Sequence, residues 1–166
     1  KPGLGDVVDL PGVYPAGRLD HDSEGLLVLT DEPWFAHRLT EPRHGHAKRY
    51  LCQVEGEPTE EARAAFRAGI PIQGTPTRPA DLVVVPTPVN LPDRPVPIRF
   101  RKSVPTSWVE VTLREGRNRQ VRRMLAAVGL PCLRLVRVEV AGLLLESLLP
   151  GTWRRLSGSE VRQLRA

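Results

Sequence analysis

The stretch GRLDHDSEGLLVLTDE, from Gly17 to Glu32, sets acidic side chains around a glycine and runs into an apolar segment. GLLVLT is short, apolar and followed by a polar break, which predicts a buried strand. Asp20 then lies in the loop that leads into this strand. Thr30 or Asp31 can cap a short helix through PWFAHRLT, with Pro33 tolerated in its first turn. This stretch therefore predicts an acidic loop, a strand and a helix in close succession.

The rest of the chain contains more strand patterns than helix patterns. The expected strands are RYLCQVEG, DLVVV, PIRFR, SWVEVTL, LRLVRVEV and GTWRRL. Helices are expected over EEARAAFRAG after Thr59, over the segment that Asn118 can cap and Gly129 ends, and after the capping-box pair Ser157 and Glu160. Strands and helices do not alternate one for one. We therefore expect an α+β fold with a mixed, mainly antiparallel sheet flanked by helices, in one domain over residues 1–166, with two lobes and a central cleft.

The charge balance points to an anionic partner without proving one. The net charge is +5, and all basic residues except Lys1, Lys48 and Lys102 are arginines. Guanidinium groups suit two-point contacts with phosphate and stacking on bases. A nucleic acid is one explanation of this excess, and simple solubility of the surface is the other.

The two cysteines, Cys52 and Cys132, lie in apolar strand-like runs and form no CxxC pair, so we expect two buried thiols and no zinc ribbon or disulfide framework. The sequence contains no secretory apolar region and no apolar run close to the ~20 residues that span a bilayer. A cytoplasmic protein is expected. The abrupt start at Lys1-Pro2-Gly3 suggests that the native N-terminus lies elsewhere.

The acidic loop itself admits three interpretations. Asp20, Asp22 and Glu24 take alternating positions before Gly25, and Asp31 falls where a calcium loop has its two-oxygen ligand. Against calcium, the flanking segments are not two helices, and Asp31 is shorter than the usual glutamate. A solvated acidic turn is the second interpretation. The third is a loop that exposes one catalytic carboxylate.

The third interpretation gains from a resemblance. GRLDHDSEGLLVLTDE resembles the catalytic motif of bacterial pseudouridine synthases of the small-subunit synthase A type, in which the loop aspartate is catalytic. KRYLCQVEG and EGRNRQVRRMLAAVGLPCLRLVRVEVAGLLLESLLPGTWRRL match further motifs of that family in the same order. Together with PGVYPAGRLD and RKSVPTSW, these segments most resemble the large-subunit pseudouridine synthase E subgroup.

The resemblance implies a fold, a reaction and a site. It implies the pseudouridine synthase catalytic fold and isomerisation of a specific uridine in 23S ribosomal RNA, with no cofactor and no metal. Asp20 would be the catalytic residue, Tyr50 would pack against the target base, and Arg122 would pair with Asp20 and keep it ionised. A carboxylate can attack or stabilise an anomeric carbon with oxocarbenium character, or take a proton, and the sequence leaves these roles open. Asp22 and Glu24 become acids that shape the loop or face solvent.

RNA binding would fall to basic residues around this site. Arg117 and Arg119 stand at or just before an expected helix N-terminus, where free amides favour anions. Arg18 would bind phosphate or brace the loop. The remaining candidates are Lys48, Arg49, Arg99, Arg101 and Lys102. His44 and His46 form an HxH pair that lacks a third metal ligand, so a polar loop is expected there.

The family comparison also shapes the expected organisation. Many relatives carry a small N-terminal RNA-binding domain, which we do not expect here. The family usually has a further strand and loop after the position of Lys1-Pro2, and we expect these to be shortened or missing in this chain. We expect a monomer. The alternatives to 23S ribosomal RNA are small-subunit ribosomal RNA or transfer RNA as substrate, and a non-catalytic basic module that binds RNA. The set Asp20, Tyr50 and Arg122 favours an enzyme, because a pure binder needs no acid inside a basic groove.

Overall fold

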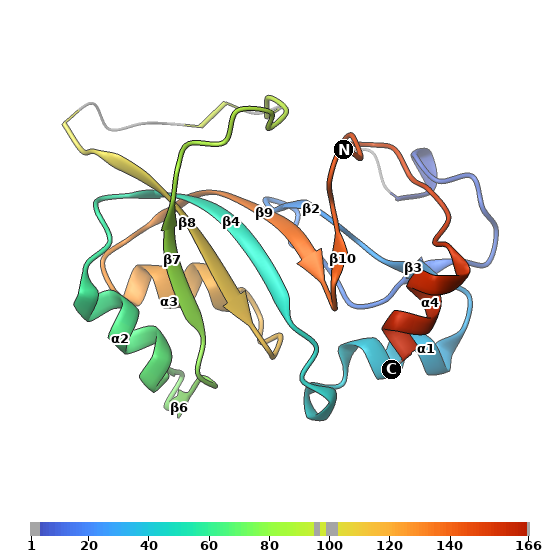
Figure 1. Cartoon of the computed structure of the whole chain (residues 1–166), viewed down its shortest axis with the longest axis horizontal. Coiled ribbons are helices and arrows are strands. Elements are labelled where there is room, and N and C mark those ends of the chain that lie inside the picture. Colours follow the sequence, from blue (N-terminus) through green and yellow to red (C-terminus); the bar gives the residue numbers. More distant parts are fainter. Residues whose placement is uncertain (1–3, 95–96, 99–102, 166) are drawn as a thin grey trace.

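A computed structural model describes residues 4–94, 97–98 and 103–165 and has the expected α+β fold with a mixed, mainly antiparallel sheet (Figure 1). The main sheet contains β4 (Lys48–Glu55), β7 (Asp81–Val85), β8 (Thr106–Leu113), β9 (Cys132–Val140) and β10 (Leu143–Leu144), in the order β10-β9-β4-β8-β7. Its sixth strand, β2 (Glu24–Gly25), runs parallel to β9. Two small hairpins pair β1 (Tyr14–Pro15) with β3 (Leu29–Thr30), and β5 (Pro71–Ile72) with β6 (Thr75–Pro76).

The helices are short and sit beside this sheet. They are α1 (Pro33–Thr40), α2 (Glu60–Ala68), α3 (Gln120–Ala127) and α4 (Gly158–Arg165), with 3-10 turns at Leu4–Asp6 and Pro42–His44. Each α-helix has eight or nine residues. Within the described ranges, no helix has the length and apolar character needed to cross a bilayer.

Strand β4 lies at the centre of the sheet and sets the register of its neighbours. Tyr50 of β4 stands opposite Val111 of β8 and opposite Arg137 of β9. Side chains of β4 alternate between buried and half-buried, as expected for a strand with one face against a core. Its buried side carries Tyr50, Cys52 and Val54. Strand β4 therefore places Tyr50 next to Arg137 of the neighbouring strand β9.

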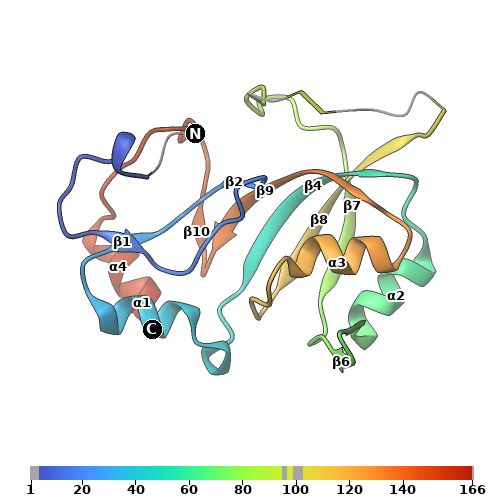
Figure 2. The same ribbon diagram turned by 180° about the vertical axis from the view of Figure 1, so that it is seen from behind.

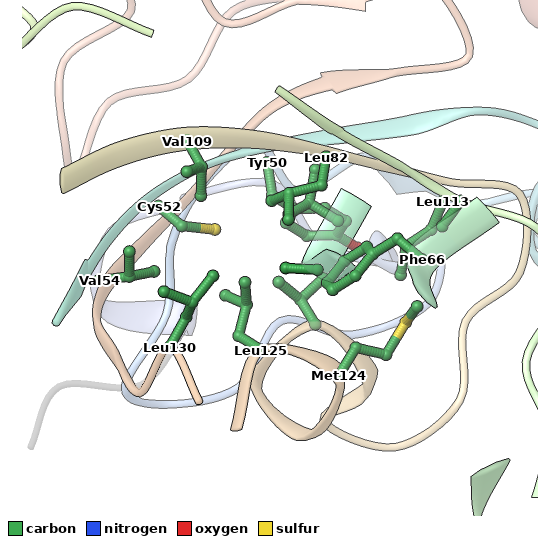
Figure 3. Packing of buried hydrophobic residues seen from close by; sticks show 14 of the residues in the cluster. Tyr50, Cys52, Val54, Phe66, Leu82, Val109, Leu113, Met124, Leu125 and Leu130 are labelled. Atoms are coloured by element: carbon green, nitrogen blue, oxygen red, sulfur yellow. The ribbon is translucent and has the colours of Figure 1, made fainter. Parts of the chain in front are cut away.

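The larger core lies between the sheet and helices α2 and α3 (Figures 2 and 3). Phe66 from α2 and Met124 and Leu125 from α3 are fully buried against the β4 and β8 side chains. Thr59 caps α2 by accepting a hydrogen bond from the Ala62 amide, and Gly69 ends that helix with a positive φ of 94°, as the sequence predicts. Apolar burial of this kind contributes ~25 cal/mol per Å² and fixes α3 on the sheet.

A second core holds the other lobe together (Figure 1). It joins Phe35 and Leu39 of α1, Val140 of β9 and Leu164 of α4 to apolar residues near the acidic loop. Ser157 and Glu160 form the expected capping box: the Glu160 carboxylate accepts from the Ser157 amide at 2.8 Å, and the Ser157 hydroxyl accepts from the Glu160 amide at 3.2 Å. The prediction of two lobes is thus met by two cores that share β9.

Several local predictions are wrong. GTWRRL forms no strand, because β10 already covers the edge of β9 and Arg154 instead pairs with Glu160 of the capping box. GLLVLT is paired only at its two ends, in β2 and β3. Neither Thr30 nor Asp31 is the N-cap of α1; Glu32 holds that position, and the Thr30 hydroxyl accepts from its amide. Most of PIRFR lies outside the described residues.

The two cysteines differ in exposure. Cys52 is fully buried in the larger core, whereas Cys132 is half-buried at its border, and both are free thiols. The thiols contact each other, and the hydrogen bond with Cys132, together with burial, raises the pKa of Cys52. The prediction of a buried thiol is therefore confirmed for Cys52 and only in part for Cys132.

Candidate active site

A pocket of about 340 Å³ opens where the two lobes meet. Its apolar walls come from both cores, with Leu39 and Val140 on one side and Leu113 and Leu135 on the other. Asp20 and Tyr50 line it together, so the fold unites two residues that are distant in sequence. Such a junction between lobes is a common place for a ligand site.

The loop that carries Asp20 is shaped by a close approach of two backbones. Gly25 has a φ of +109°, and a β-carbon there would lie 2.6 Å from the Arg137 amide nitrogen and would also strike the Arg137 carbonyl oxygen. Only glycine tolerates this position. The Ser23 amide donates to the Asp20 carbonyl at 2.9 Å and closes the turn. The glycine therefore lets the loop dock directly on β9.

Two arginines approach the Asp20 carboxylate, and neither is Arg122. Arg119 Nη1 lies 3.5 Å from Asp20 Oδ2, and Arg18 Nη2 lies 3.8 Å from Asp20 Oδ1. Among the described residues, no ion pair joins Asp20 to Arg122. The predicted pairing of Asp20 with Arg122 is therefore wrong in this structure, and Arg119 takes that place.

The start of α3 explains the exchange. Arg119, not the predicted Asn118, is the N-cap of α3, and it adopts the left-handed conformation with φ 52° and ψ 34°. This turn directs its guanidinium toward the acidic loop. Arg122, one turn into the helix, donates to the Asp22 carbonyl at 2.8 Å and to Ser23 Oγ at 3.3 Å. Asn118 accepts a hydrogen bond from Arg18 instead.

The other loop acids are paired with arginines. Asp22 accepts two hydrogen bonds from Arg119, at 2.9 and 2.8 Å, and this bonding holds the pKa of Asp22 well below its usual range. Glu24 accepts two from Arg134, at 2.9 and 2.8 Å. Among the described residues, no three side chains of the kinds that ligate metals gather in one place. These acids shape the loop, and their geometry gives the calcium interpretation no support.

Tyr50 and Lys48 reach the pocket from β4. Tyr50 is buried, with 9% of its surface exposed, and burial raises the pKa of its phenol. Burial also lowers the pKa of the Lys48 ammonium, and the positive charge of Arg137 lowers it further. Both side chains line the pocket with Asp20. Tyr50 is placed where a flat ring could pack against it.

Sequence reasoning missed three arginines of the pocket and its surrounding loops. Arg137 lines the pocket and stands opposite Tyr50 in the β4–β9 register. Arg94, from the β7–β8 connection, donates to the Asp22 carbonyl at 3.3 Å, and Arg134 donates to Pro92 of the same connection. Arg134 and Arg137 follow strand alternation poorly, since both are buried in an apolar strand. The only signal in the sequence was two arginines within an otherwise apolar strand, LRLVRVEV, which does not by itself show that they are buried.

The predicted RNA-binding residues fall into separate groups. Arg18, Lys48, Arg117 and Arg119 line the pocket. The Arg117 guanidinium donates to the Ile72 and Thr75 carbonyls, which ties it to the β5–β6 hairpin. Arg49 pairs with Glu110 and Glu139 at 3.0 and 2.8 Å and is absent from the pocket lining. Arg99, Arg101 and Lys102 lie outside the described residues.

The histidine pair lies near α1. The rings of His44 and His46 are 6.1 Å apart, and burial lowers the pKa of His46. His46 Nε2 is buried without a hydrogen-bond partner among the described residues.

The chemistry available in the pocket follows from its charges. Asp20 is the single carboxylate among the described residues that line it, while Arg18, Lys48, Arg117, Arg119, Arg122 and Arg137 line it too. A carboxylate in this position can act as a nucleophile or base on a bound polyanion. The surplus of cations suits a ligand with phosphate groups.

Comparison with known proteins gives this geometry a context. Residues 8–127 match the family described as RNA pseudouridylate synthase. The chain is 53% identical over 155 residues to "Ribosomal large subunit pseudouridine synthase E" of Xanthomonas campestris pv. campestris, covering 93% of this chain and 83% of that protein. It is 38% identical over 154 residues to "Ribosomal large subunit pseudouridine synthase B" of Bacillus subtilis, covering 93% of this chain and 58% of that protein. The label "small-subunit synthase A type" is not supported, since these names refer to the large subunit.

A solved structure agrees in fold. The crystal structure of a pseudouridylate synthase superposes with a TM-score of 0.82 at 34% identity and covers 98% of this chain. This chain spans 65% of that one.

Proposed function

The chain belongs to the RNA pseudouridylate synthase family, and from this premise we propose that it isomerises a specific uridine to pseudouridine in large-subunit (23S) ribosomal RNA. The substrate follows from relatives that are named as large-subunit synthases, among them one with 46% identity in Vibrio vulnificus. We propose that the described part of the chain acts as one catalytic domain, and the pocket between the two lobes supports this. We propose that it acts as a monomer in the cytoplasm, where ribosomal RNA is assembled with its proteins.

One observation carries the proposal. Among the described residues that line the basic pocket, Asp20 is the single carboxylate, and it lies on the loop that resembles the catalytic motif of the family. A module that only bound RNA would gain nothing from an acid at the bottom of a basic pocket, because the acid repels phosphate. The alternative of a non-catalytic RNA binder is therefore less favoured.

The reaction makes limited demands on the protein. The bond between the ribose carbon and the uracil nitrogen N1 breaks, the uracil turns within the pocket, and its C5 carbon joins the ribose. C5 then loses a proton and N1 gains one. No electron is gained or lost overall and no water is consumed. Asp20 either attacks the anomeric carbon or takes a proton, and both roles need an ionised carboxylate. Tyr50 provides the face against which the base packs.

The basic residues divide into three tasks under this proposal. Arg119 and Arg18 pair with the Asp20 carboxylate and orient it. Arg122 braces the loop through Asp22 and Ser23, which makes it a positioning residue. Lys48 contributes positive charge for the phosphates of the target nucleotide. Flipping that nucleotide into the pocket costs a few kcal/mol. Arg117 and Arg49 can bind RNA only through atoms that their partners in the protein do not occupy.

The decisive experiment maps pseudouridines. Large-subunit ribosomal RNA from cells that lack the gene should lose modification at one uridine, and plasmid-borne wild-type protein should restore it. Plasmid-borne Asp20→Asn protein should not. Loss of a pseudouridine in small-subunit ribosomal RNA or transfer RNA instead would replace the substrate, and an unchanged map in all RNA classes would overturn the proposed function.

A further inference from the structure

Arg137 is a buried arginine that lines the pocket and has no carboxylate partner within the described part of the chain. Only 6% of its surface is exposed, and among the described residues no Asp or Glu lies within ion-pair distance of it. A buried charge costs several kcal/mol unless its hydrogen bonds compensate. A leucine at this position would fill an apolar strand at lower cost. The charge at Arg137 therefore calls for a task beyond packing.

The Arg137 side chain donates hydrogen bonds to the backbone at both ends of the Asp20 loop. Its Nε and Nη2 donate to the Leu26 carbonyl at 2.8 and 2.6 Å, and its Nη1 reaches the Arg18 carbonyl at 3.4 Å. Arg18 precedes Asp20 and Leu26 follows it, so one side chain ties the loop before and after the carboxylate. The Leu26 amide in turn donates to the Arg137 carbonyl at 2.9 Å, where Gly25 permits the close approach.

The same side chain also lies next to Tyr50. Arg137 stands opposite Tyr50 in the β4–β9 register, and the charge of its guanidinium opposes the rise in the pKa of the Tyr50 phenol that burial causes. Both residues line the pocket with Asp20. The rigid, planar fork of arginine can serve several acceptors in fixed directions, which the single ammonium of lysine cannot. Arg137 is thus hydrogen-bonded to the loop of one expected catalytic residue and stands beside the other.

We propose that Arg137 is a positioning residue that fixes the Asp20 loop and the Tyr50 ring relative to each other. It touches neither the uracil nor the anomeric carbon in this role. The inference rests on the proposed function, because it assigns the task of Arg137 within that reaction. Displacement of catalytic groups by about 1 Å can cost ~100-fold in rate, so the effect should be large although no reacting atom is contacted.

The kinetic test uses Arg137→Lys, which keeps the charge and loses the fork. We expect the single-turnover rate at saturating RNA to fall by ~10–100-fold, with RNA affinity changed by less than about threefold, because phosphate contacts carry the affinity. Arg63→Lys on α2 is the matched control, since Arg63 is part-buried, pairs within its own helix and lies outside the pocket lining. A rate within twofold of wild type for Arg137→Lys would overturn the proposal.

A double-mutant cycle separates positioning from a general loss of structure. In a Tyr50→Phe background, part of the loss caused by Arg137→Lys should disappear, because Tyr50→Phe removes the phenol oxygen that Arg137 is proposed to hold. Strictly additive losses in rate would show that Arg137 does not act through Tyr50, and this would overturn the proposal as stated.

A third measurement needs neither RNA nor a substituted Arg137. In the ¹⁵N NMR spectrum, the Arg137 Nε–H should exchange slowly with solvent, and Tyr50→Phe should shift this resonance. An Nε–H that exchanges freely, or one that ignores Tyr50→Phe, would overturn the proposal even if Arg137→Lys fails to fold. Failure of the wild-type protein to form pseudouridine would overturn the proposed function instead, and the NMR result would still decide whether Arg137 holds both elements.

Discussion

Arg119 donates one hydrogen bond to each carboxylate oxygen of Asp22, at 2.9 and 2.8 Å, and the same guanidinium lies 3.5 Å from the Asp20 carboxylate. Asp22 therefore sets the orientation in which Arg119 meets Asp20. Two aspartates that differ by two positions in the chain take different parts: one anchors an arginine, and the other shares it inside the pocket.

Replacement of the pocket carboxylate should remove the activity. Asp20→Asn keeps the side-chain shape and deletes the charge, so pseudouridine formation should fall below detection while RNA affinity changes by only a few-fold. The assay is tritium release or mass spectrometry on transcribed RNA. Asp22→Asn is the matched control and should retain measurable turnover. Normal turnover by verified Asp20→Asn protein would eliminate Asp20 as nucleophile or base.

The two arginines of α3 should separate in kinetics. Arg119→Ala should lower the single-turnover rate by ~100–1,000-fold, because it removes a charge next to Asp20. Arg122→Ala should cost ~1–3 kcal/mol of stability through its lost bonds to the Asp22 carbonyl and Ser23, with a smaller loss of rate. Arg123→Ala, on the same helix and outside the pocket lining, serves as the control. The opposite order of rates would restore Arg122 as the partner of Asp20.

The Asp22–Arg119 pair should make stability depend on pH. The pKa of Asp22 is lowered on folding, so its stabilisation is complete above the unfolded-state pKa and is lost as the pH falls through the folded-state value. Urea unfolding should show Asp22→Asn to be less stable than wild type by ~1–2 kcal/mol at pH 7, and this difference should shrink steadily below about pH 5.

Asp31→Asn, at an exposed position, controls for the loss of a negative charge and should change stability by less than ~0.5 kcal/mol at pH 7. A difference between wild type and Asp22→Asn that stays constant from pH 7 to pH 3 would contradict the assigned role of the pair.

RNA binding should weaken steeply as the salt concentration rises. Arg18 has a side chain that is 74% exposed at the pocket mouth, so Arg18→Ala should reduce the slope of log affinity against log salt by up to ~1. Arg67→Ala, exposed on α2 and outside the pocket lining, should leave the slope unchanged. Equal slopes for wild type and Arg18→Ala would mean that Arg18 makes no phosphate contact.

Chelation should leave the reaction intact, because the chemistry is assigned to side chains. After exhaustive EDTA treatment, with the RNA fold held by monovalent salt, the single-turnover rate should stay within about twofold of the untreated rate. Activity that disappears and returns specifically with calcium would revive the metal interpretation of the acidic loop.

The sequence was informative where structure follows from local rules. Thr59 and Gly69 bound α2 as expected, and Ser157 and Glu160 form their capping box, because caps depend on residues a few positions apart. The place of Asp20 in the pocket agrees with the family motif. The predicted partner of Asp20 was wrong because the pairing depends on the left-handed conformation of Arg119. Arginine seldom adopts this conformation, and no neighbouring residue indicates it.

Long-range contacts account for most of what was missed. GTWRRL was predicted to be a strand, yet the edge of β9 that could receive it is occupied by β10 and β2. Arg137 looks like an ordinary strand residue until β2 is laid beside β9, when its side chain meets the Leu26 carbonyl. Such features depend on which segments meet in space, and the sequence pattern alone does not fix that.

The docking of β2 on β9 also constrains when the enzyme can become active. Leu26 and Arg137 are 111 positions apart, and Asp22 and Arg122 are 100 apart. Contacts of such large separation form late, because the intervening chain must first be ordered. On the ribosome, the acidic loop emerges before β9 and has no docking surface until β9 has followed. A nascent or truncated chain that lacks β9 would therefore carry the Asp20 motif without an assembled pocket, so that competence to modify RNA arises only after β9 has been synthesised.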